Sequence, residues 1–191
     1  MKKSIALLVV MIVFGMIFNV FAQEAKKAEV PEFKYVGVQK CKMCHKGEKK
    51  GKIFELWQER KHSHAYETLA SDYSKEVAQK AGIKGDPQQA AECLVCHVTA
   101  FEATAEQKEA TLTLEEGVSC EACHGPGSVY KSMKIMKDIY KGTAKGSDHG
   151  LIEPNNEVCV KCHNPKSPTY KEFKFEEAVK AIAHSVPEKA E

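Results

Sequence analysis

The pattern of apolar and polar positions predicts short helices separated by loops. Residues 53–70 have the periodicity of one helix, with Ile, Leu and Trp side chains gathered on one side. Ser71 or Asp72 is suited to cap a second helix, which Gly82 would end. The chain is therefore expected to be built from short helical pieces.

The same signals recur along the rest of the chain. Residues 111–116 are the one stretch with strand character, and residues 141–150 have the composition of a loop. The expected fold class is mainly α, with short helices and loops and little or no β structure. Further helices are expected after Asp86 and Pro87, from Val129 to Tyr140, after Asn155 or Asn156, and from Phe175 to Ile182.

The apolar positions near the N-terminus have a different meaning. Two lysines precede an apolar run over residues 5–18, and a small-residue cleavage site ends at Ala22, as in a secretory signal peptide. The run is shorter than the roughly 20 residues that a membrane-spanning helix needs. We therefore expect a periplasmic protein without a stable membrane anchor, divided into a signal peptide (1–22), a linker (23–34) and a folded domain (35–191).

Composition and charge narrow the possible functions. The chain has 28 basic and 26 acidic residues, and two of the basic ones are Lys2 and Lys3 of the signal peptide. The mature chain is therefore neutral, which gives no support to nucleic-acid binding. Aromatic residues are few and aliphatic ones modest in number, so side chains alone would form a thin core.

All eight cysteines belong to one motif, Cys-x-x-Cys-His, which attaches c-type haem. Its four copies are CKMCH (41–45), CLVCH (93–97), CEACH (120–124) and CVKCH (159–163). Two thiols reach the two vinyl groups on one edge of the porphyrin, and the histidine that follows reaches the iron. The expected thioether donors are Cys41, Cys44, Cys93, Cys96, Cys120, Cys123, Cys159 and Cys162, and the expected proximal ligands are His45, His97, His124 and His163.

Other uses of paired cysteines explain the pattern less well. Zinc sites and redox dithiols also use Cys-x-x-Cys, but neither needs a histidine after every second cysteine. A disulfide framework is compatible with export, yet four such histidines would then have no purpose. Four covalently attached haem groups are therefore expected, and they would form most of the hydrophobic core.

Four histidines remain for the sixth position of the irons: His62, His64, His149 and His184. Their number equals the number of haems, whereas Met133 and Met136 are weaker candidates. Residues two apart on a helix point about 200° away from each other, so His62 and His64 cannot bind the same iron. For His64, a surface position is an equal alternative to ligation.

The segments WQERKHSHAYETL, GVSCEACHGPGS and VCVKCHNPKSPTYKEF make the chain similar to the tetrahaem cytochrome c-554 family. The resemblance implies a largely helical protein with haems in near-parallel pairs. It implies that His62 is the distal ligand of the third haem, and that His149 and His184 serve the first and fourth. It also implies a five-coordinate second haem on His97, which the additional His64 could close.

The expected function is electron transfer between redox partner proteins in a respiratory chain. Ionised propionates would make the holoprotein acidic, so we expect electrostatic steering toward a basic face of a partner. An alternative is a small enzyme that reduces nitric oxide or a related nitrogen oxide at a five-coordinate haem. A third possibility is a subunit of an extracellular haem filament.

Overall fold

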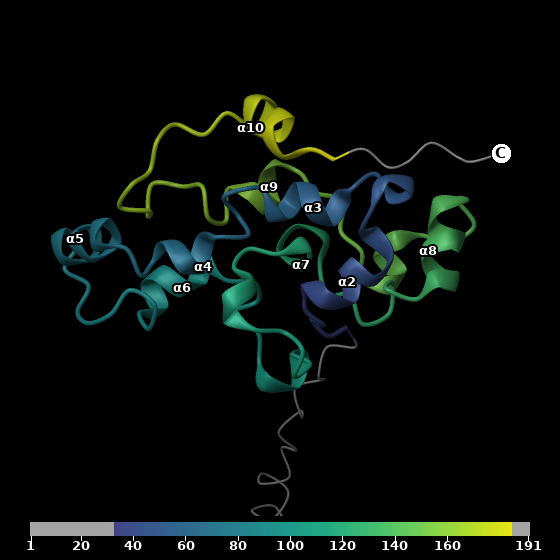
Figure 1. Cartoon of the computed structure of the whole chain (residues 1–191), viewed down its shortest axis with the longest axis horizontal. Helices are drawn as coiled ribbons and strands as arrows, with labels where there is room; N and C mark the ends of the chain where they lie inside the picture. Colours follow the sequence, from purple (N-terminus) through teal and green to yellow (C-terminus); the bar gives the residue numbers. More distant parts are fainter. Residues whose placement is uncertain (1–32, 185–191) are drawn as a thin grey trace, which may run out of the picture. The chain divides into compact units, whose positions relative to one another are not determined.

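The computed structural model describes residues 33–184, which belong to one compact unit of short helices and turns (Figure 1). The signal peptide and most of the linker lie outside the described residues. The α-helices are α2 (Val38–His45), α3 (Ile53–Gln58), α4 (Ala65–Thr68), α5 (Asp72–Lys80), α6 (Ala91–His97), α7 (Cys120–His124), α8 (Met133–Tyr140), α9 (Asn156–Cys159) and α10 (Phe175–Ile182). The 3-10 helices are η1 (Glu48–Lys50), η2 (Ala105–Gln107), η3 (Leu114–Glu116) and η4 (Gly146–His149).

Residues 33–184 contain no β-strand; Tyr35 and Lys108 form an isolated parallel bridge. The mainly α fold class is confirmed. The stretch 111–116, which has strand character in the sequence, instead ends in the 3-10 helix η3. None of the helices in the described range is long and apolar enough to cross a membrane.

Side-chain packing alone gives this unit a small core. Among residues 33–184, nine hydrophobic side chains are buried, and the main cluster consists of Leu69, Leu94 and Val98. Helices α8 and α10 have amphipathic sequences, yet neither contains a buried residue. Protein atoms therefore cover only part of the apolar surface that the helices present.

The expected single helix over residues 53–70 is interrupted, and that part of the prediction is wrong. Helix α3 ends at Gln58, residues 59–64 form turns, and α4 begins at Ala65. The hydroxyl of Ser63 donates to the carbonyl of Arg60 over 2.7 Å, and the backbone N–H of Val118 donates to the carbonyl of His62 over 2.9 Å. These bonds satisfy backbone groups outside the helical ladder, so the segment bends at the two histidines.

Other boundaries agree with the capping signals in the sequence more closely. Ser71 caps α5 by accepting a hydrogen bond from the N–H of Ser74, and Asn155 caps α9 through the N–H of Val158. Helix α10 has the expected bounds. Helix α8 starts four residues later than expected, because residues 129–132 form turns.

Two buried glutamates join the segment before α2 to the segment around α7. Glu121 is 1% exposed, and its carboxylate accepts hydrogen bonds from the backbone N–H groups of Val36 (2.9 Å), Gly37 (2.8 Å) and Gly127 (2.6 Å). Burial raises the pKa of Glu121, while these three donors act in the opposite direction. The carboxylate therefore fixes the first Cys-x-x-Cys-His motif against the third.

Glu116 makes a second connection of the same kind. Its carboxylate accepts a 2.9 Å hydrogen bond from the N–H of Val38, the first residue of α2, and a 2.8 Å bond from the hydroxyl of Ser119. Burial raises the pKa of this glutamate as well. Helices α2 and α7 contact each other as a result of both connections.

Candidate functional site

Each of the four motifs lies on or beside a short helix. The first occupies the end of α2, the second the end of α6, and the third the whole of α7. In the fourth motif, α9 ends at Cys159, and the N–H of His163 donates to the carbonyl of Cys159 over 3.0 Å. Residues three apart lie on one face of a helical turn, so the two cysteines of a motif can reach one edge of the same ligand.

Thiols of different motifs lie close to one another. Cys41 of the first motif is near Cys120 of the third, and this neighbour together with burial raises the pKa of Cys41. Burial raises the pKa of Cys123 of the third motif, and Cys159 of the fourth motif, which is nearby, adds to this effect.

Cys162 of the fourth motif lies close to Cys96 of the second. Burial and this neighbour raise the pKa of Cys162 to about 12. The motifs therefore follow one another in space as first, third, fourth and second, an order that differs from their order in the chain. Contacts between distant segments determine this order, so it could not be read from the motifs themselves.

Two pairs of imidazoles have the separation that one iron requires. The ring centroids of His62 and His163 are 6.0 Å apart, and those of His124 and His184 are 5.9 Å apart. With metal–nitrogen distances of about 2 Å, two imidazoles on opposite sides of one metal ion have centroids about 6 Å apart. Burial lowers the pKa of all four rings, which favours the neutral form that can bind a metal.

This pairing differs from the one that the family resemblance implies. The resemblance associates His62 with the third motif and His184 with the fourth. In the structure His62 lies beside His163 of the fourth motif, and His184 lies beside His124 of the third. The bend at residues 59–64 directs His62, and the extended residues after α10 place His184.

The histidine of the second motif, His97, is held in one tautomer. The Nδ1 atom of His97 lies 2.7 Å from the carbonyl oxygen of Ala65. Because a carbonyl only accepts, Nδ1 carries the proton, and the lone pair of Nε2 remains for a metal. Within residues 33–184, neither His97 nor His45 makes a ring contact with another histidine.

His64 and His149 have less suitable surroundings. His64 is exposed, and its two ring nitrogens contact the carboxylate of Glu67 (3.0 Å) and the carbonyl of Gln58 (3.1 Å). Both ring nitrogens are thus directed at oxygen atoms of the protein, which favours the surface position. His149 ends η4 and is half-buried.

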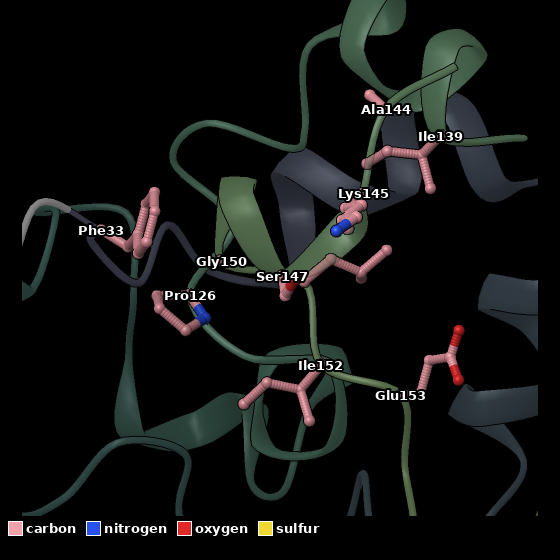
Figure 2. A pocket seen from close by; sticks show the side chains of 11 residues that line it. Phe33, Pro126, Ile139, Ala144, Lys145, Ser147, Gly150, Ile152 and Glu153 are labelled. Carbon is pink, nitrogen blue, oxygen red and sulfur yellow. The ribbon is translucent and has the colours of Figure 1, made fainter. Parts of the chain in front are cut away.

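A hollow with mainly apolar walls lies next to the third motif. Its volume is about 790 Å³, and Figure 2 shows Phe33 and Pro126 on one side of it and Ile139 on another. Ile152, which also lines it, donates its N–H to the carbonyl of His124 over 2.9 Å. Gly146 and Gly150 are also among the residues that line it.

These features fit haem better than a bare metal ion. In the described part of the chain, no group of three or more His, Cys, Asp or Glu residues is arranged to hold a metal ion, whereas structural zinc needs four ligands. Paired thiols, imidazoles about 6 Å apart and a thin side-chain core are what several c-type haems require.

Comparisons with known proteins agree with this chemistry. The family described as "Cytochrome c554 and c-prime" matches residues 40–125, which contain the first three motifs. Cytochrome c-554 of Nitrosomonas europaea is 29% identical over 206 aligned positions, which cover 90% of this chain and 81% of that protein. No solved structure matches the chain significantly. Both matches support a c-type cytochrome similar to the cytochrome c-554 family, that is, a protein that transfers electrons with covalently bound haem c.

Proposed function

We propose that this protein is a periplasmic tetrahaem electron carrier that exchanges electrons with redox partner proteins. Each motif would hold one haem through its two cysteines and its histidine. Three haems would have a second histidine: His62 for the fourth motif, His184 for the third and His149 for the first. When bound, haem c supplies an iron that gains and loses one electron.

The observation that carries this proposal is that cysteines of different motifs lie close to one another. Cys41 is near Cys120, Cys123 is near Cys159, and Cys162 is near Cys96. Because each thiol would mark the attached edge of its cofactor, this proximity supports an edge-to-edge arrangement of four haems. A chain that needed only one reactive centre would have no reason to arrange four sites in this way.

Contacts within the protein hold the histidines of these sites in position and favour their neutral form. Burial keeps His62 and His124 neutral by lowering their pKa values, and the Ala65 carbonyl orients His97. Glu121 and Glu116 hold the first and third motifs together. These contacts fix the ligands before any partner binds, which limits the rearrangement that accompanies a change of charge.

One observation favours the alternative of a small reductive enzyme. Among the described residues, neither His97 nor His45 has a ring contact with another histidine; because the proposal assigns His149 to the first motif, the second site would be the one left five-coordinate. Such a centre could bind nitric oxide or a related nitrogen oxide. His64 would lie at the surface rather than close this site.

The proposal is tested on the exported holoprotein. Its intact mass should equal the chain after signal cleavage plus four haems, and a chemical reductant should reduce all four. Fewer than four covalent haems, or mature protein in the cytoplasm, would contradict the proposal. Steady consumption of nitric oxide with an electron donor would instead favour the enzyme.

A further inference from the structure

The first motif is more open to solvent than the other three. All eight cysteines lie among the described residues, and Cys44 alone is exposed; the others are partly buried. Its neighbour Met43 is 72% exposed, the highest value among the exposed large hydrophobic residues in residues 33–184. The outer attachment edge of the first site therefore reaches the protein surface.

Lysines surround this edge. Residues 40–52 contain six lysines and one glutamate, and Glu48 forms an ion pair with Lys52 over 3.0 Å. Lys46, Lys49 and Lys50 are also exposed.

The lysines belong to a turn that hydrogen bonds hold in place. The N–H of Gly47 donates to the carboxylate of Glu55 over 2.9 Å, and the N–H of Lys52 donates to the carbonyl of Gly47 over 3.0 Å. These bonds close the loop that contains η1 and tie it to α3. The backbone that carries these lysines is therefore held in place a few residues after Met43 and Cys44.

The segment around the second motif has the opposite charge. Residues 61–104, which contain this motif, carry six acidic and four basic residues. The neutral net charge of the mature chain conceals this difference. Local charge, more than net charge, steers a partner to one part of a surface.

We propose that an acidic redox protein docks on the first-motif edge, defined as Met43, Cys44, Lys46, Lys49, Lys50 and Lys52. Met43 would supply the apolar centre of the contact and the lysines its charged rim, as in small transient interfaces. This inference rests on the proposed electron-transfer function. The net charge of the holoprotein suggests a partner with a basic face. At the first-motif edge we expect a partner with an acidic face instead.

The test measures reduction of the oxidised holoprotein by two donors in a stopped-flow instrument. One donor is a reduced plant-type [2Fe–2S] ferredoxin, chosen for its acidic surface, and the other is the cation hexaammineruthenium(II). The variant Met43→Glu adds one negative charge at the centre of the edge. The fourth motif has Lys161 at the equivalent position, so a charged residue there is compatible with haem attachment.

Tyr73→Glu is the matched control, because Tyr73 is 65% exposed on α5 and the charge change is the same. At low ionic strength, Met43→Glu should slow reduction by ferredoxin roughly tenfold and accelerate reduction by the cation, whereas Tyr73→Glu should change either rate by less than about twofold. Equal effects of the two variants, or no effect of Met43→Glu, would overturn the docking proposal. A wild-type protein that accepts electrons from neither donor would contradict the proposed function itself.

Discussion

Replacing the buried Glu121 with glutamine should weaken the connection between the first and third motifs. The glutamine has the same size, but it keeps one acceptor oxygen and places an amide NH₂ group where the second oxygen was. If that oxygen remains near Val36 and Gly127, the N–H of Gly37 loses the acceptor that lies 2.8 Å away. The substitution therefore tests the carboxylate with little change in packing.

The magnitude follows from the hydrogen bonds that change. One buried N–H without an acceptor costs about 1–3 kcal/mol, and the bonds to Val36 and Gly127 lose the contribution of the negative charge. Burying a neutral amide instead of a carboxylate offsets part of this cost. We expect the free energy of unfolding to fall by about 2–3 kcal/mol, which lowers Tm by about 4–12 °C in a domain of this size.

Thermal unfolding of the holoprotein at pH 7, followed by far-ultraviolet circular dichroism, measures this effect. Glu115→Gln is the matched control, since Glu115 is an exposed neighbour of Glu116 and its loss should change the melting temperature far less than the loss of Glu121. Haem content is measured in both variants. If Glu121→Gln retained all its haems and melted together with the control, the structural role assigned to Glu121 would be refuted.

Two further predictions concern the same region. Burial raises the pKa of Glu121 and Glu116 from the ordinary value of 4.5. Their contribution to stability is therefore present below that pH and is lost as the pH rises through the raised values. The difference between the melting temperatures of wild-type and Glu121→Gln protein should show this loss when it is measured over pH, and a difference independent of pH would contradict it. Gly37 has φ +83°, and an added Cβ would meet the carbonyl of Thr111, so Gly37→Ala should lower the free energy of unfolding by about 2 kcal/mol or more. Gly85→Ala, at φ +88° in open space, should lower it by only about 1–2 kcal/mol. Equal melting temperatures of the two variants would argue against the close approach at Gly37.

The motifs and several helix ends could be predicted from the sequence, but the arrangement of the motifs in space could be predicted only in part. The Cys-x-x-Cys-His spacing specifies an attachment site within five residues, and the caps of α5 and α9 depend on neighbours three residues away. Such short-range features can be recognised without a structure. The amphipathic bounds of α10 could be predicted for the same reason.

Long-range contacts determined what the sequence did not reveal. The helix expected over residues 53–70 breaks because Val118, more than fifty residues away, bonds the carbonyl of His62. That bend brings His62 to His163 and changes the expected pairing. Glu121 occupies a variable position of its motif, so its role became visible only through its bonds to residues 36 and 37.

The low-temperature electron paramagnetic resonance spectrum of the fully oxidised holoprotein tests the ligand arrangement most directly, because it counts high-spin haems. The wild-type protein should show one high-spin haem, at the second motif. His62→Ala should add a second high-spin haem, and His64→Ala should add none. A wild-type spectrum with no high-spin haem, an unchanged spectrum for His62→Ala, or a new high-spin signal in His64→Ala would contradict the arrangement.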